Sequence, residues 1–387
     1  MKKAYADILF FVLCLCAVFS QDNSYEKTIA EPGSRLEKIE PAGFIEQAAV
    51  NGESSIIVPP GDSGLLYSGR IDFSKPATPV FIWQGSGFSC TFYGPSFGIS
   101  LSSSGQNSYY NVIIDGKIYL LHPSGGSQSY YVLDADLGEG LHTCTVFKRV
   151  EAMFAQDKFY GLVLERREKV GGLGSPPPEK DLLIEFYGDS ITAGACNEDP
   201  DEDSYTNYLE HNNFTSYGAI TCRLLDADYS NIAVSGTGIS AGWNDILLSK
   251  TWKNLYPRLR SPLYDFSKRK PDIVVINLGQ NDYGYPQSKG EPFPSDFTEK
   301  YEAFLHQVRE VYPDAWIICA TGGMGAVKSS RALITGINNA VKNCNDEKIS
   351  VYFYKAFTYN HPRLDTHEKM AYELINFLTD KGIVVQD

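Results

Sequence analysis

The chain has 387 residues, of which 43% are hydrophobic and 13% aromatic, a composition typical of a globular protein with room for two cores. Its formal net charge is −13. Because an acidic surface repels phosphate backbones, we expect no nucleic-acid partner.

Residues 1–20 are typical of a secretory signal peptide. Lys2 and Lys3 precede the apolar run "ILFFVLCLCAVF" (8–19), which is short for a membrane span, and "VFS" before Gln21 is typical of a cleavage site. We therefore expect a secreted protein, extracellular or periplasmic, without stable membrane association; a retained anchor is the alternative. We assign residues 21–49 to an N-terminal segment that precedes the first domain.

Six cysteines follow the predicted signal peptide. An even number in an oxidising compartment permits disulfides, and Cys90–Cys144 is the predicted pair. The chain has no CxxC spacing and no Cys/His cluster in sequence, so no metal site is predicted.

Residues 50–167 contain only short runs that are typical of strands, with Gly, Pro, Asn or Asp between most of them. Examples are "VFIWQG" (80–85), "SCTFYG" (89–94) and "YYNVIIDG" (109–116). Regularly spaced short strands with turn residues predict a β-sandwich domain.

A Gly- and Pro-rich stretch, "EKVGGLGSPPPEK" (168–180), predicts a linker. From residue 181 to 387, strand-like and helix-like segments alternate, which predicts an α/β domain with helices on both faces of a parallel sheet. Ligand sites in such sheets lie beyond the carboxyl ends of the strands. The expected strands are 182–188, 229–236, 271–282, 314–322 and 349–357, and the expected helices are 215–227, 295–313, 329–344 and 366–381.

The first candidate residue at a strand end is Ser190 in "IEFYGDSITAG" (184–194). It stands at a helix start, where backbone N–H groups and the helix dipole favour negative charge. Ser190 is either a helix cap or a nucleophile. If it attacks a carbonyl, the oxyanion of the substrate would form at this helix start. Gly236 in "IAVSGTGIS" (232–240) is either an ordinary loop glycine or a second backbone donor to that oxyanion.

Two further candidates follow later strands. Asn281 in "LGQNDYG" (278–284) is either part of an Asn-Asp turn or a neutral amide donor to the oxyanion. The segment "YNHPRLDTHEKMA" (359–371) contains His361 and His367, the two histidines placed to act as the base.

These four blocks, in this order, resemble those of the SGNH (GDSL-type) hydrolases over about residues 181–380. In the first half, "GRIDFSKPATPVFIWQGSGFSCTFYG" (69–94) and "HTCTVFKRVEA" (142–152) are similar to the N-terminal jelly-roll domain of carbohydrate esterase family 2. The resemblance implies a jelly-roll β-sandwich followed by an SGNH hydrolase domain. It also implies O-deacetylation of plant cell-wall polysaccharide, such as xylan or glucomannan, by a serine esterase without a metal or organic cofactor.

The resemblance further implies that Ser190 is the nucleophile and His361 the base. The Ser190 and Gly236 N–H groups and the Asn281 amide would form the oxyanion hole. One departure matters, because the family pattern has Asp two residues before the catalytic His, and this chain has Tyr359 there. We therefore expect a Ser190–His361 dyad in which a backbone carbonyl orients the imidazole.

Two alternatives to this dyad stay open. Asp365 and His367 would together supply the acid and the base, or another acid would reach His361 through space. Trp243, in "SAGWND" (240–245), is either part of a sugar platform or a core residue.

We expect a monomer whose partner is an acetylated polysaccharide or oligosaccharide. A lipase or thioesterase on the same machinery is the first alternative. A non-catalytic carbohydrate-binding protein is the second, and retention of all four block residues disfavours it.

Overall fold

The computed structural model describes residues 39–166, 172–200, 203 and 205–385. The predicted signal peptide lies outside these residues, as do parts of the segments 21–49 and 168–180.

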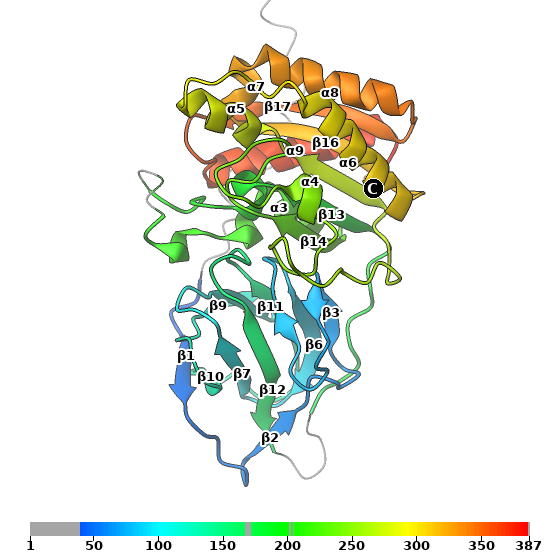
Figure 1. The fold of residues 1–387 in the computed structure, drawn as a ribbon. Helices are drawn as coiled ribbons and strands as arrows, with labels where there is room; N and C mark the ends of the chain where they lie inside the picture. Colours follow the sequence, from blue (N-terminus) through cyan, green and yellow to red (C-terminus); the bar gives the residue numbers. More distant parts are fainter. Residues whose placement is uncertain (1–38, 167–171, 201–202, 204, 386–387) are drawn as a thin grey trace, which may run out of the picture. The chain divides into compact units, whose positions relative to one another are not determined.

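Two antiparallel sheets occupy the first half of the chain (Figure 1). Strand pairs place alternate apolar residues of both sheets in one core, where the Phe159 ring stacks on Phe81 and Phe88 at centroid distances of 5.5 and 5.1 Å. One sheet contains β1 (Phe44–Gln47), β10 (Ser129–Leu133), β7 (Phe97–Ser103), β12 (Asp157–Glu165), β5 (Val80–Phe81) and β4 (Ile71–Asp72), with β2 (Ser55–Val58) beside β12. The other contains β3 (Leu66–Ser68), β6 (Gly87–Tyr93), β11 (Leu141–Lys148), β8 (Tyr110–Ile114) and β9 (Lys117–Leu121).

The predicted Cys90–Cys144 disulfide is not present. The two residues lie opposite each other on β6 and β11, but both are free thiols. Both are buried in the apolar core, where a thiol packs as a small apolar side chain. Burial raises the pKa of the Cys144 thiol, which disfavours the thiolate that disulfide formation requires.

The second half contains a five-stranded parallel sheet in the order β14-β13-β15-β16-β17. Its strands are β13 (Leu183–Gly188), β14 (Asp228–Ala233), β15 (Ile273–Asn277), β16 (Trp316–Met324) and β17 (Ile349–Thr358). The chain runs from β13 outward to β14 and then returns to the other side of β13 at β15. Such a reversal opens a crevice at the carboxyl ends of the strands.

Helices cover both faces of this sheet (Figure 1). Apolar side chains of α4 (Leu248–Thr251), α6 (Phe297–Val311) and α8 (Arg331–Cys344) pack on one face, and those of α3 (Tyr217–Leu224) and α9 (Leu364–Asp380) pack on the other. The short helices α2 (Ser190–Ala193), α5 (Gln280–Ser288) and α7 (Ala326–Ser329) follow β13, β15 and β16. The predicted fold class, a β-sandwich followed by an α/β domain with a parallel sheet, is confirmed.

A buried ion pair joins the two halves near the middle of β13. Arg70 follows β3, and its guanidinium donates to the Glu185 carboxylate at 3.1 Å and to the Tyr187 hydroxyl at 2.6 Å. Arg70 and Glu185 are 1% and 4% exposed, so each charge depends on the other for compensation. The Tyr312 hydroxyl also donates to Glu185, at 2.7 Å.

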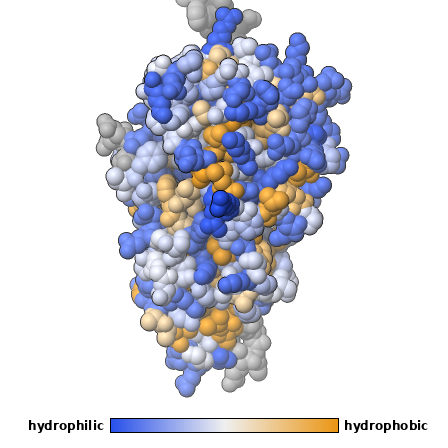
Figure 2. Space-filling view, viewed as in Figure 1, coloured by the Kyte–Doolittle hydropathy of each residue, from blue (hydrophilic) through white to orange (hydrophobic). Residues whose placement is uncertain are grey.

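The surface carries few extended apolar regions on the face shown in Figure 2, where hydrophilic residues surround small separate hydrophobic patches. None of the described helices is long and apolar enough to cross a membrane.

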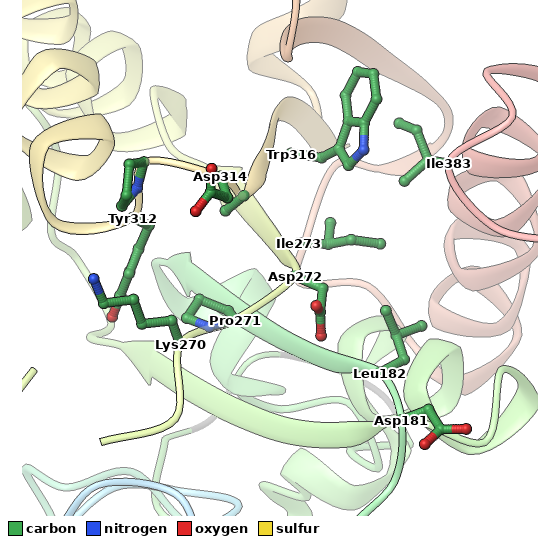
Figure 3. Close-up of a pocket in the computed structure, with 12 residues that line it drawn as sticks. Asp181, Leu182, Lys270, Pro271, Asp272, Ile273, Tyr312, Asp314, Trp316 and Ile383 are labelled. Atoms are coloured by element: carbon green, nitrogen blue, oxygen red, sulfur yellow. The ribbon is translucent and has the colours of Figure 1, made fainter. Parts of the chain in front are cut away.

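A pocket lies at the amino ends of β13, β15 and β16 (Figure 3). Asp181, Lys270, Asp272 and Asp314 supply charged groups to its lining. This edge of the sheet is opposite the carboxyl ends, so the pocket is separate from the candidate active site.

Candidate active site

Ser190 begins α2 directly beyond the end of β13. Asp189, not Ser190, caps the helix, because its carboxylate accepts the Ile191 N–H at 3.0 Å. The hydroxyl of Ser190 is therefore not needed as a cap. Glycine is required at position 188, because a Cβ there would lie 2.0 Å from the Thr192 hydroxyl oxygen.

His361, in the loop between β17 and α9, reaches Ser190. Its Nε2 lies 2.8 Å from the Ser190 Oγ. Its Nδ1 lies 2.6 Å from Oδ2 of Asp203, and the same carboxylate oxygen accepts the His361 backbone N–H at 2.9 Å. Ser190, His361 and Asp203 thus have the hydrogen-bond order of a nucleophile, a base and an orienting acid.

Arg363 holds the other oxygen of the Asp203 carboxylate, at 2.8 Å. Burial alone would raise the pKa of Asp203, but hydrogen bonds from His361 and Arg363 outweigh it and hold the pKa well below its usual range. Asp203 is therefore ionised at neutral pH and favours the His361 tautomer with hydrogen on Nδ1. In that tautomer Nε2 carries no hydrogen and can accept the Ser190 proton.

The expected backbone carbonyl at Nδ1 is thus replaced by a carboxylate. Tyr359, at the position of the missing acid, is 85% exposed. Asp203 comes from the segment between α2 and α3, far from His361 in sequence. It stands in an acidic run, "NEDPDEDSY" (197–205), in which no spacing distinguishes it from its neighbours.

His367 and Asp365 have other contacts. The His367 ring is fully buried, and its Nδ1 accepts the Tyr217 N–H at 3.1 Å. Burial lowers the pKa of His367 to about 3, so the ring is neutral at working pH. The Asp365 carboxylate meets Lys369 at 3.0 Å. These contacts are structural, and they do not support the Asp365–His367 alternative.

Gly236 occupies a tight turn after β14, with φ of +79°. The Ser235 carbonyl accepts from the Asn244 amide at 2.7 Å, and the Gly236 carbonyl accepts the Trp243 N–H at 2.8 Å. Within the described residues, the Gly236 N–H itself donates to no protein acceptor. No protein acceptor therefore competes with an oxyanion for this N–H, and the role of Gly236 as an oxyanion donor stays a prediction. We call residues 235–237 the oxyanion turn.

Asn281 lies in the first turn of α5, not in a loop turn. Its amide donates to the Thr237 carbonyl at 2.8 Å and faces the Asp189 carboxylate at 3.1 Å. The first contact orients the amide toward the oxyanion turn. The role of Asn281 as an oxyanion donor stays a prediction. Both amide hydrogens already have protein acceptors, so the substrate oxygen would have to share with Asp189 the hydrogen that faces its carboxylate. Burial raises the pKa of Asp189 to about 7.

Two aromatic residues border the site. Trp243 is 58% exposed, so it is not a core residue, and its ring meets Tyr285 edge-on at a centroid distance of 5.3 Å. The Tyr205 hydroxyl lies 2.9 Å from Nε2 of His361. Sequence reasoning missed Tyr205, because one tyrosine among 25 carries no signal of its own.

One group of metal-ligating atoms occurs here. Single ligand atoms of Cys196, Asp203 and His361 lie within 4.8 Å of one another. Asp203 and His361 are already hydrogen-bonded to each other, and the Arg363 guanidinium supplies a positive charge beside Asp203. The contacts of Asp203 and His361 therefore favour a role beside Ser190 over metal binding.

Comparison with known proteins agrees with both halves of this architecture. The carbohydrate esterase 2 N-terminal family model matches residues 67–173, and the GDSL-like lipase/acylhydrolase family model matches residues 186–372.

Among curated proteins, the chain is 32% identical over 333 residues to the cellulase/esterase CelE of Acetivibrio thermocellus. The match covers 82% of this chain but only 39% of CelE. The chain is also 26% identical to an acetylxylan esterase/glucomannan deacetylase of Cellvibrio japonicus, with 80% of this chain and 87% of that protein covered.

Among solved structures, a family two carbohydrate esterase from Clostridium thermocellum in complex with cellohexaose is 30% identical, with a TM-score of 0.73. The match covers 82% of this chain and 99% of that one. A likeness of this extent includes both the antiparallel sheets and the parallel sheet that carries the candidate site. The chain therefore belongs to carbohydrate esterase family 2, whose members are carboxylic ester hydrolases.

Proposed function

We propose that this protein is a secreted serine esterase that removes O-acetyl groups from plant cell-wall polysaccharide such as xylan or glucomannan. The observation that carries the proposal is the chain of hydrogen bonds from Ser190 through His361 to Asp203.

In the proposed reaction, Ser190 Oγ attacks the acetyl carbonyl while Nε2 of His361 takes its proton. Asp203 stabilises the resulting imidazolium. The Ser190 and Gly236 N–H groups and the Asn281 amide stabilise the oxyanion. The C–O bond to the sugar then breaks, and Nε2 returns the proton to the sugar oxygen. Water, with its proton taken by Nε2, attacks the acetyl-enzyme. The bond between the acetyl carbon and Ser190 Oγ then breaks, Nε2 returns the proton to Oγ, and acetate leaves.

Two observations support an acetylated sugar as the substrate. The exposed Trp243 ring stands beside the oxyanion turn, where an aromatic face suits a sugar ring. The names of the Cellvibrio japonicus relative point to the same class of substrate.

The test measures acetate release from acetylated xylan, acetylated glucomannan and 4-nitrophenyl acetate, with 4-nitrophenyl decanoate as the probe for a lipase. We expect Ser190→Ala and His361→Ala to lose nearly all activity. His367→Gln, if folded, keeps most of it. Faster turnover of the decanoate would favour the lipase alternative. Tight polysaccharide binding without any acetate release would favour the binding-protein alternative.

A further inference from the structure

One acidic side chain of the β-sandwich half reaches the candidate active site. Glu151 follows β11 by three residues and is 1% exposed. Its carboxylate accepts the backbone N–H of Ser235 at 2.7 Å and also accepts the Ser235 hydroxyl. Ser235 is the first residue of the oxyanion turn and directly precedes Gly236.

These contacts determine the direction of the Gly236 N–H. The Ser235 carbonyl and the Gly236 N–H belong to one planar trans peptide, so they point in opposite directions. Asn244 holds the carbonyl, and Glu151 holds the N–H and the hydroxyl of the same residue. Because the N–H, the hydroxyl and the carbonyl of Ser235 are all hydrogen-bonded, the direction of the Gly236 N–H is fixed.

Burying the Glu151 carboxylate costs folding free energy, and a residue that only joined the two halves of the chain would not need a charge there. A buried carboxylate is unfavourable without strong partners, and burial raises the pKa of Glu151. The nearby ammonium group of Lys148 pairs instead with Asp157, at 3.7 Å. The Ser235 hydrogen bonds are thus the main compensation for this carboxylate.

Arg149, which directly follows β11, contacts a second part of the site. The Arg149 guanidinium donates to Glu198 at 2.6 Å and to the Leu209 carbonyl at 2.8 Å. These two residues flank the segment that carries Asp203 and Tyr205. Arg149 and Glu151 therefore contact the two segments that carry the orienting acid and the oxyanion donor.

We propose that Glu151 is a positioning residue of the esterase, through which the β-sandwich half holds the oxyanion turn in its reactive geometry. This inference rests on the proposed function. Glu151 acts through Ser235 and Gly236 and does not touch the substrate.

The test compares kcat and KM on 4-nitrophenyl acetate for Glu151→Ala, Glu151→Gln and the wild type. A misaligned oxyanion donor stabilises the transition state poorly, so we expect kcat of Glu151→Ala to fall by about 10- to 100-fold. KM should stay within about twofold, because ground-state binding depends little on this donor. Glu151→Gln keeps an acceptor for the Ser235 N–H and should recover most of kcat.

Asp72→Ala is the matched control. Asp72 is also a carboxylate of the β-sandwich half that accepts a hydroxyl of the other half, that of Tyr256 at 2.5 Å, but it lies away from the oxyanion turn. We expect its kcat to be unchanged. Ser235→Ala removes only the hydroxyl and serves if Glu151→Ala does not fold. Ser235→Ala should lower kcat of the wild type by a few-fold. The same substitution should lower kcat of the Glu151→Gln variant by a smaller factor, because the two residues act through one contact.

The outcomes separate this inference from the proposed function. A wild type that releases no acetate from any substrate would overturn both. An active wild type with kcat unchanged in Glu151→Ala, or unchanged in the folded Ser235→Ala, would overturn only the role of Glu151. An equal loss of kcat in Asp72→Ala would also overturn it, because the effect would then come from docking of the two halves in general.

Discussion

Replacing Asp203 by Asn tests the orienting acid of the candidate triad. The carboxylate accepts three donors, namely the Nδ1–H and backbone N–H of His361 on one oxygen and the Arg363 guanidinium on the other. An Asn side chain has one acceptor oxygen and one NH₂ group. Whichever way it turns, its NH₂ group faces a donor, either that of Arg363 or those of His361.

The expected loss follows from these contacts. A hydrogen bond to a charged group contributes about 1.5–3 kcal/mol, and a donor left facing a donor costs about 1–3 kcal/mol more. If both terms act mainly on the transition state, in which His361 is charged, the sum corresponds to a fall in kcat of about 10²- to 10⁴-fold. If the amide turns its NH₂ group to Nδ1, the imidazole also takes the wrong tautomer, and Nε2 no longer accepts the Ser190 proton.

The assay is steady-state hydrolysis of 4-nitrophenyl acetate at pH 7, with thermal melting to show that the variant is folded. Asp365→Asn is the control, because that carboxylate contacts Lys369 on an exposed helix face. We expect its kcat to stay within about twofold of the wild type. A folded Asp203→Asn enzyme within threefold of wild-type kcat would refute the triad and restore the predicted dyad.

Three further predictions concern stability and substrate binding. The pKa of His367 falls from 6.5 to about 3 in the folded state, so below pH 6.5 the unfolded chain binds a proton that the folded chain does not. Unfolding in urea should therefore show that stability falls by about 2 kcal/mol more between pH 7 and pH 5 in the wild type than in His367→Gln; equal losses would contradict this. Arg70→Met should lower the free energy of unfolding at pH 7 by about 3–5 kcal/mol, because it leaves Glu185 buried without its cation. A loss below 1 kcal/mol in the same urea titration would show that the pair is not needed. Trp243→Ala should raise KM for acetylated polysaccharide by about 2- to 12-fold, as expected for one aromatic contact, with constants for 4-nitrophenyl acetate unchanged. An equal effect on both substrates would argue against a sugar platform.

The sequence predicted the meeting of Ser190 and His361 because of a simple geometric rule. Carboxyl ends of parallel strands gather at one edge, so residues just beyond them meet without any knowledge of side-chain detail. The same rule predicted Gly236 and Asn281 at that edge. It did not predict that Asn281 lies in a helix. A strand was expected over 271–282, but β15 ends at Asn277, and Gly279, with φ of +117°, is the N-cap of α5.

The remaining parts of the site depend on contacts that no sequence pattern encodes. Asp203 lies in a connecting segment without regular spacing, and Glu151 comes from the other half of the chain. The Cys90 and Cys144 side chains do face each other, as alternation along two strands allows, but alternation carries no information on their redox state. Polar contacts made by connecting segments and by the other half of the chain are thus the part that sequence reasoning missed.

The Arg70–Glu185 pair has a consequence for the order in which the protein matures. Glu185 is a carboxylate in the middle of a buried strand, and its compensating cation comes from a segment more than 100 residues earlier in the chain. During synthesis the β-sandwich half leaves the ribosome first, and N-terminal domains generally fold first. Arg70 is then already in place when β13 emerges. A chain in which the order of the two halves was reversed would instead have to build its parallel sheet around an uncompensated charge.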